Sequence, residues 1–224
     1  MCSQDERRVV PVERLLFYPA AMLIRFALSA LLSVAPVMAQ VPAPVSPAPK
    51  PATVRVDLDT SEGRIVLELE KERAPITTAN FLKYVDQKRL DGTSIYRSVK
   101  VQPGYGFIQG GIRNDVKRLL PPIPHEPTTK TGLTHGDGTI SMARTTPGTA
   151  RGDFFITVGA IPSMDADPSQ PGDNQGFAAF GHVVEGMDVV RAILALPTGG
   201  SAQNAVMQGE ILDPPVAITG AKRV

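Results

Sequence analysis

The 224-residue chain contains a single cysteine, Cys2, and no tryptophan, and aromatic residues make up only 5% of it. One cysteine excludes an intrachain disulfide and leaves no cysteine pair for a structural zinc site. The 23 Lys and Arg residues nearly balance the 22 Asp and Glu residues, which gives a formal net charge of +1. Because no basic stripe is available to neutralise phosphates, the composition argues against nucleic acid as a main partner.

Several motifs that carry enzyme chemistry are also missing. The chain shows no alternation of strand and helix patterns, and no dinucleotide-binding or Walker motif. Ser141 lies outside any G-x-S-x-G elbow and has no evident base partner in the sequence, so we expect a core or hydrogen-bonding serine there. These absences argue against nucleotide chemistry and against a serine nucleophile.

The histidines and loop acids form no recognisable metal site. His125 and His135 are ten residues apart, which matches no compact ligand spacing, and we expect a structural role or hydrogen bonds within loops for them. His182 falls in a strand pattern, exposed or at the edge of the core. The aspartates of the 165–173 segment do not fit an EF-hand loop and favour a solvated loop. We therefore expect no metal ion and no cofactor.

The beginning of the chain resembles a secretory signal. Arg25 precedes an apolar run that ends in small residues up to Ala39, and Met22 would begin a well-proportioned signal by itself. We expect residues 1–39 to be a cleaved signal peptide or an uncleaved N-terminal hydrophobic segment. Five prolines within ten positions then predict a Pro/Ala-rich linker at 40–52.

Beyond the linker, the chain reads as many short strands and two helices. Alternating or β-branched patterns predict strands, and Pro75 in a first turn and an apolar stripe near i, i+3, i+7 spacing predict the helices. We expect strands at 53–60, 64–69, 93–112 (two, with a loop), 138–143, 153–158, 178–184 and 210–217, and helices at 74–85 and 186–194. This content predicts a closed β-barrel or sandwich with helical caps.

The segment from Arg97 to Gly111 concentrates polar and aromatic groups beside glycines. Arg97 does not titrate near neutral pH, so it is a poor general acid or base. Beside Phe107 and Gln109 it is suited to holding a polar group on an apolar floor. An alternative is that Arg97 is a surface cation at a strand end and Phe107 is ordinary core.

Five motifs in this order resemble the cyclophilin family of peptidyl-prolyl cis-trans isomerases, especially bacterial exported or periplasmic members. The resemblance runs from about Val54 to Thr219. The motifs are Tyr96-Arg97, GFIQGG at 106–111, GTISMA at 138–143, DFFI at 153–156 and FGHVVEGMDVV at 180–190.

The resemblance implies a cyclophilin-like isomerase domain at 53–224, built as a closed eight-stranded antiparallel β-barrel capped by two α-helices. It also implies the activity, which is faster rotation about X–Pro bonds of unfolded or exported polypeptides in the periplasm. Rotation faces a barrier of about 20 kcal/mol because of amide resonance. A donor aimed at the proline nitrogen would stabilise the twisted amide without a covalent step.

By the same resemblance, Arg97 is that donor and Gln109 holds Arg97 or the substrate carbonyl. The backbone near Ala143 and Arg144 would pair with the substrate backbone, and Phe155 would be the pocket floor. The remaining positions assigned to substrate binding are Phe107, Met142, Asp153, Met164 and Phe177.

The sequence departs from the family pattern at several positions. Asp153 stands where Gln is common, and it could pair with Arg97 or orient it. The usual Trp is absent, with Ser163 near its place, which should weaken cyclosporin binding more than catalysis. Phe177 stands where the pocket wall usually has His. The spacing from Arg97 to Gln109 is longer than usual, which leaves Phe107 or Tyr105 for the pocket role.

The expected partners are proline-containing unfolded polypeptides, bound by a monomer without a stable membrane partner if the signal is cleaved. An inner-membrane anchor facing the periplasm is the alternative location. Asp153 and Phe177 keep a second function open, a non-catalytic cyclophilin-like module that binds Pro-containing peptides as a chaperone.

Overall fold

The computed structural model describes residues 50–113, 115–202 and 204–224. The predicted signal segment 1–39 and most of the predicted linker lie outside these residues. None of the helices in the described ranges is long and apolar enough to cross a membrane.

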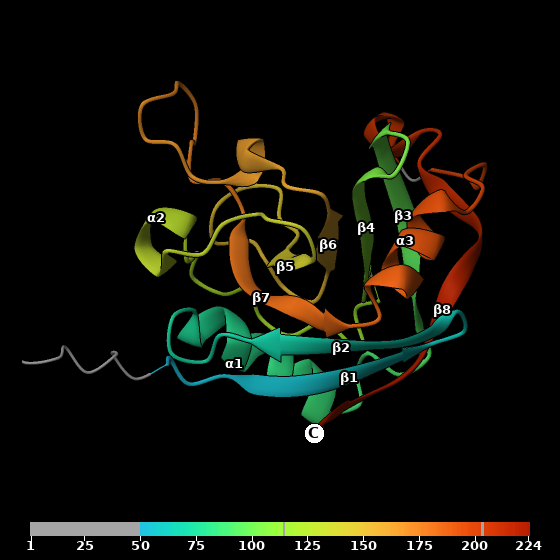
Figure 1. The fold of residues 1–224 in the computed structure, drawn as a ribbon, viewed down its shortest axis with the longest axis horizontal. Coiled ribbons are helices and arrows are strands. Elements are labelled where there is room, and N and C mark those ends of the chain that lie inside the picture. Colours follow the sequence, from blue (N-terminus) through green and yellow to red (C-terminus); the bar gives the residue numbers. More distant parts are fainter. Residues whose placement is uncertain (1–49, 114, 203) are drawn as a thin grey trace, which may run out of the picture. The chain divides into compact units, whose positions relative to one another are not determined.

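The described chain forms a closed barrel of eight antiparallel strands (Figure 1). Going round the barrel, the order is β1-β2-β7-β5-β6-β4-β3-β8, and every neighbouring pair is antiparallel. The strands are β1 (Val54–Thr60), β2 (Gly63–Leu69), β3 (Thr93–Gln102), β4 (Tyr105–Gly111), β5 (Thr139–Met142), β6 (Phe154–Val158), β7 (Ala178–Glu185) and β8 (Ile211–Arg223). The barrel predicted from the sequence is confirmed.

Strand alternation separates the barrel interior from the surface that carries the site. On β6, Phe154 and Ile156 belong to the hydrophobic core, and on the paired strand β4 the inward residue is Ile108. Their neighbours Phe155 and Gln109 are partners in the β4–β6 register and point the other way. The sheet therefore presents an outward row of side chains on β3, β4 and β6.

Two longer helices pack against the barrel, α1 (Pro75–Asp86) and α3 (Met187–Ala195). Phe81 of α1 contacts the core rings of Phe154 and Phe180, at centroid distances of 5.6 and 5.4 Å. Helix α3 contacts β2, β3, β4 and β6 and lies apart from α1 (Figure 1). The four-residue helix α2 (Thr128–Thr131) and two 3-10 turns, η1 (Pro162–Met164) and η2 (Ala205–Met207), were not predicted.

The N-terminus of α1 is capped by a carboxylate from a distant loop. Ala74 cannot cap the helix with its side chain, and Pro75 begins the first turn. The buried Glu126 accepts hydrogen bonds from the backbone N–H of Ile76 and from the N–H and hydroxyl of Thr77. A negative charge at a helix N-terminus is favoured by the helix dipole. This contact joins the 120s loop to the helix.

Candidate active site

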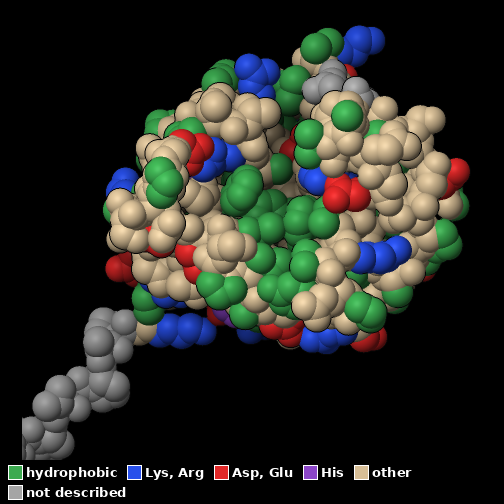
Figure 2. Space-filling view, turned by 90° about the horizontal axis from the view of Figure 1, so that it is seen from above, with side chains coloured by type: hydrophobic (Ala, Val, Ile, Leu, Met, Phe, Trp, Pro, Cys, Tyr) green, Lys and Arg blue, Asp and Glu red, His purple; other side chains and the backbone are tan. Residues whose placement is uncertain are grey.

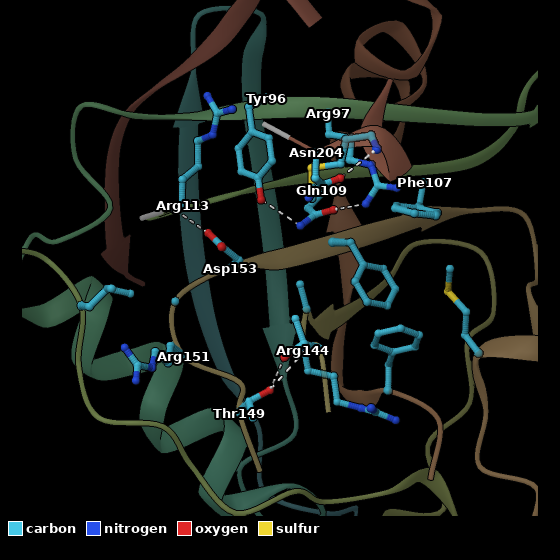
Figure 3. Close-up of a pocket in the computed structure, with 18 residues that line it drawn as sticks. Tyr96, Arg97, Phe107, Gln109, Arg113, Arg144, Thr149, Arg151, Asp153 and Asn204 are labelled. Atoms are coloured by element: carbon cyan, nitrogen blue, oxygen red, sulfur yellow. Dashed lines mark hydrogen bonds between the residues drawn. The ribbon is translucent and has the colours of Figure 1, made fainter. Parts of the chain in front are cut away.

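A cavity of about 550 Å³ lies over the outward row of β3, β4 and β6. Figure 2 shows a hollow on this face with a hydrophobic floor and charged side chains at its edge. Figure 3 shows its lining, with aromatic rings at one end and arginines around Asp153 at the other. The lining residues are Tyr96, Arg97, Phe107, Gln109, Arg113, Leu119, Ala143, Arg144, Thr145, Thr149, Arg151, Gly152, Asp153, Phe155, Met164, Phe177, Asn204 and Met207.

Arg97 is held by two acceptors on opposite sides of its guanidinium. Its Nε and Nη2 both donate to Oε2 of Glu210, at 2.8 and 2.6 Å. Its Nη1 donates to Oε1 of Gln109 at 2.8 Å (Figure 3). The Arg97 side chain is 15% exposed, so the ion pair is partly shielded from water. A guanidinium has five N–H groups. Three of them are fixed here, and two remain for a ligand in the cavity.

The register of the barrel brings Glu210 to Arg97. Ile211, at the start of β8, is paired with Arg97 on β3, and the Glu210 carbonyl accepts the N–H of Ser98 at 2.9 Å. The carboxylate therefore reaches the guanidinium across adjacent strands, although 113 positions separate the two residues. No local pattern in the sequence indicates this pair, because only the β3–β8 register makes the contact.

Gln109 links Arg97 to the buried Tyr96 through two hydrogen bonds. Its Oε1 accepts from Arg97, while its Nε2 donates to the hydroxyl of Tyr96 at 2.8 Å. Tyr96 is 3% exposed, and burial, followed by the nearby Asp153 charge, raises the pKa of its phenol. The phenol is therefore neutral at physiological pH, and the amide cannot rotate freely. Of the two roles predicted for Gln109, the structure shows the contact to Arg97.

The floor of the apolar end is a group of rings around Phe155. Phe107 lies 5.4 Å from Phe155, and Phe177 meets it edge-on at 5.3 Å and 88°. Met164 lines the same end. Such offset and edge-to-face contacts favour one ring arrangement. The guanidinium carbon of Arg97 lies 5.5 Å from the centre of the Phe107 ring, so the fixed cation stands beside the apolar floor.

A buried hydrogen-bonded chain lies behind this floor. His135 stacks on Phe155 with centroids 5.8 Å apart and planes within 15°. Its Nδ1 lies 2.6 Å from Oδ1 of Asp165, and its Nε2 lies 3.0 Å from Oγ of Ser141. Burial lowers the pKa of His135, against the raising influence of Asp165. A neutral imidazole would donate from Nδ1 to the aspartate and accept the serine hydroxyl at Nε2.

This Asp-His-Ser chain is a structural feature, because its serine cannot meet a substrate. Ser141 is fully buried and His135 is 1% exposed. The predicted hydrogen-bonding role of Ser141 is confirmed, but sequence reasoning missed its partner His135. A six-residue separation between them gave no motif to detect. The pair instead supports Phe155 from behind.

The opposite end of the cavity carries Arg113 and Arg151 around Asp153 (Figure 3). Asp153 Oδ1 accepts the backbone N–H of Arg113 at 2.7 Å. Burial raises the pKa of Asp153, and the N–H groups of Arg113 and Ile112 oppose that effect. Gly111 permits this close approach, since it has φ of +130° and a Cβ there would lie 2.7 Å from Asp153 Oδ1.

Arg144 also lines the cavity, beside Phe177, and its charge is paired. Its guanidinium donates to both carboxylate oxygens of Asp173, at 2.9 and 3.0 Å, and to the carbonyl of Gly176. It also lies 5.2 Å from the centre of the Phe177 ring. The side chain is only 6% exposed. Arg144 therefore fixes the 173–177 loop.

The structure brings nine of the ten predicted site residues to the cavity and corrects the other. Met142 is 1% exposed and belongs to the core, because β5 alternation turns it into the barrel. Phe107 lines the cavity, whereas Tyr105 packs near Gly159 with its hydroxyl on the Ala160 carbonyl, which resolves the alternative.

One finer expectation about Asp153 also needs correction. The suggested pairing of Asp153 with Arg97 is wrong, since Arg97 pairs with Glu210 and Asp153 receives the Arg113 N–H. The Ala143 N–H donates to the Asp153 carbonyl at 2.9 Å, and the pairing of the substrate backbone with the remaining backbone groups near Ala143 and Arg144 stays a prediction.

The residues considered for metal binding have other partners. His125 contacts the Gln175 carbonyl, and His182 is half-buried on β7. Of the loop aspartates, Asp165 contacts His135, Asp167 contacts Ser169 and Asp173 contacts Arg144. Within the described ranges no group of three or more His, Cys, Asp or Glu side chains could hold a metal ion.

Comparison with known proteins identifies sequences similar to this one. The family model described as "Cyclophilin type peptidyl-prolyl cis-trans isomerase/CLD" matches residues 55–220. The peptidyl-prolyl cis-trans isomerase cyp18 of Streptomyces antibioticus is 38% identical over 170 residues, covering 75% of this chain and 96% of that protein. Peptidyl-prolyl cis-trans isomerase A of Dickeya dadantii is 34% identical over 173 residues, covering 76% and 84% respectively.

A solved structure has a similar fold. The crystal structure of a Cryptosporidium parvum cyclophilin-type isomerase, determined in the presence of the dipeptide Ala-Pro, superimposes with a TM-score of 0.58 at 20% sequence identity. The match covers 75% of this chain and 96% of that one. At this identity the likeness concerns the fold.

Proposed function

The chain belongs to the family of cyclophilin-type peptidyl-prolyl cis-trans isomerases (EC 5.2.1.8), and from this premise we propose that Arg97 is the group that accelerates X–Pro rotation. The observation that carries the proposal is the fixed guanidinium beside an aromatic floor. Arg97 needs no proton transfer for this role, because its charge is permanent.

To accelerate the reaction, the enzyme must stabilise the twisted amide, which is the transition state of the rotation. Twisting the X–Pro bond removes amide conjugation and leaves a lone pair on the proline nitrogen. A donor that meets this lone pair binds the twisted state better than either planar isomer, which lowers the barrier. One of the two remaining N–H groups of Arg97 would make that hydrogen bond. No covalent bond forms or breaks.

The rings at the apolar end would hold the proline while the bond turns. The pyrrolidine is compact and apolar, and it fits a pocket lined by Phe107, Phe155 and Met164. The ring contacts around Phe155 and the His135 stack keep the floor in one arrangement. A fixed proline lets the preceding carbonyl rotate against it, so binding and catalysis use adjacent groups.

Glu210 and Gln109 act as positioning residues for Arg97. They hold three of its N–H groups, so the guanidinium does not have to reorganise when the lone pair develops. The Glu210 charge also offsets part of the Arg97 charge. This offset is the feature that favours the second candidate, a module that binds Pro-containing peptides without accelerating rotation.

The isomerisation of a short peptide with one proline separates the two functions. Exchange spectroscopy by NMR would follow the cis and trans signals with a catalytic amount of protein. We expect faster exchange at protein concentrations far below that of the peptide. Peptide signals that shift on binding while the exchange rate stays at its uncatalysed value would establish the binding module instead.

We also propose that the substrates are unfolded or newly exported polypeptides, met in the periplasm by a monomeric enzyme. The support is the signal-like segment before residue 40 and the intervening Pro-rich linker. Retention of that segment as an inner-membrane anchor is the alternative. The intact mass of the exported protein tests this, since cleavage after Ala39 gives a mass that retention does not.

A further inference from the structure

Four arginines line the cavity, and their ion pairs divide them into two groups. Arg97 is paired with Glu210, and Arg144 is paired with Asp173. Arg113 and Arg151 also line the cavity, yet neither makes a salt bridge to any residue in the described ranges. Two cations without a carboxylate partner therefore stand at one end of a peptide-sized groove.

Arg113 is held in place by contacts that do not neutralise it. Its backbone N–H is fixed by Asp153, and its guanidinium carbon lies 4.5 Å from the centre of the Tyr96 ring. Its φ of +53° is in the left-handed region, which is unfavourable for a residue with a Cβ. Such a conformation persists only where surrounding contacts impose it, and it is frequent at binding sites.

Arg151 faces the same end from the β5–β6 connection. It is an exposed residue next to the buried Gly152, and its carbonyl accepts the side-chain amide of Asn80 at 2.7 Å. The backbone is thus anchored to α1, and the side chain lines the cavity on the other side of Asp153 from the Arg113 guanidinium (Figure 3). Leu119 supplies an apolar wall there, which suits the methylene groups of a long acidic side chain.

One carboxyl group opposes the two cations, which is that of Asp153. It makes no salt bridge to Arg113 or Arg151, and its Oδ1 is engaged by a backbone N–H. This single carboxylate can offset the charge of only one of the two guanidinium groups. Two cations against one carboxyl leave this end with a positive potential.

We propose that the end of the cavity flanked by Arg113 and Arg151 is a subsite for a carboxylate side chain of the bound polypeptide, which would pair with one of the two guanidinium groups in the field of both. The enzyme then favours substrates with an acidic residue close to the X–Pro bond. This inference rests on the proposed function, because the same cavity must bind the proline at its aromatic end. Guanidinium groups suit the role, since their planar N–H pairs match carboxylate geometry.

The test uses two matched peptide series, each with one proline. A single Glu is moved through the three positions on either side of the proline, and the second series has Gln at the same positions. Isomerisation rates and calorimetric binding constants are measured at low ionic strength for the wild type, Arg151→Gln and Arg113→Asn. Asn tolerates the left-handed backbone at that position. Lys71→Gln, an exposed charge outside the cavity, is the control for net charge.

We expect one position at which Glu is preferred over Gln by roughly two- to fivefold, the range of partly exposed ion pairs. Arg151→Gln and Arg113→Asn should each reduce this ratio, Lys71→Gln should preserve it, and 0.5 M salt should bring it toward one. A ratio near one at every position in the wild type, or an equal loss in Lys71→Gln, would overturn the inference.

Failure of the proposed function gives a different result. If the Gln peptides bind but none is isomerised faster than in buffer, Arg97 is not acting as a catalyst. The calorimetric Glu-to-Gln ratio still decides whether the subsite exists.

Discussion

Arg97 and Arg113 line one cavity, yet their guanidinium groups meet different surroundings. Arg97 has a carboxylate and an amide on two sides, whereas Arg113 has an aromatic ring beside it and no salt bridge in the described part of the chain. Two arginines in one cavity can therefore have different roles, because their partners and not the residue type decide whether the guanidinium is held in place or left without an ion pair. A fully positioned cation suits a brief transition state, and an unpaired cation suits a ligand that brings its own charge.

The aromatic end of the cavity depends on the buried His135, and removal of this residue should have the largest effect among the residues that support the site. His135→Gln breaks the optimised contacts with Asp165 and Ser141 and leaves a gap beneath Phe155. We expect a loss of about 2 kcal/mol in the free energy of unfolding. Denaturant unfolding measures this loss, and an unchanged midpoint would show that the floor does not need this support.

The same residue predicts a pH dependence. Burial lowers the pKa of His135 below its ordinary value of 6.5, so the unfolded chain takes up the proton first. The stability linked to this group is fully present above the ordinary pKa and falls as the pH drops below it. Between pH 7.5 and 5.5, the free energy of unfolding should therefore fall more for the wild type than for His135→Gln. Equal pH slopes would contradict this assignment.

Removal of the Glu210 carboxylate should give the next largest effect. It would leave Arg97, like Arg113, without a salt bridge to Glu210 or to another described carboxylate. We expect Glu210→Ala to lower kcat/KM about tenfold, mainly through kcat, because the guanidinium loses its fixed orientation. Glu210→Gln should restore most of the rate, since an amide oxygen can still accept the N–H groups. A faster Glu210→Ala enzyme would show that the carboxylate restrains Arg97.

The smallest expected effect concerns the end of the cavity that carries Arg113 and Arg151. Asp153→Asn removes the carboxylate that opposes Arg113 and Arg151 while keeping an oxygen for the Arg113 N–H. We expect the preference for Glu over Gln peptides to increase about twofold. Paired rate measurements at low salt check this ratio. A reduced preference would mean that Asp153 orients the arginines instead of opposing them.

The comparison also shows what could be predicted from the sequence. Alternation and turn signals are local, so the strands and two helices were predictable, and ordered motifs placed Arg97, Gln109 and Phe155. Glu210 was not predictable, because it reaches Arg97 only through the β3–β8 register. The Ser141–His135 bond is local, but it depends on the course of the loop before β5, for which the sequence has no motif. Met142 was misplaced because a motif does not say which of its side chains faces the core.

The most direct measurement of the central claim compares wild type, Arg97→Ala and Arg191→Ala in isomerisation of a neutral peptide with one proline. Arg191 is an arginine of α3 that pairs with Asp137 outside the cavity, so its loss controls for a missing charge. We predict that Arg97→Ala lowers kcat/KM by roughly tenfold to a thousandfold, as expected when an enzyme loses one preorganised hydrogen-bond donor. Arg191→Ala should keep a kcat/KM near that of the wild type. A folded Arg97→Ala protein with the wild-type rate would contradict the account.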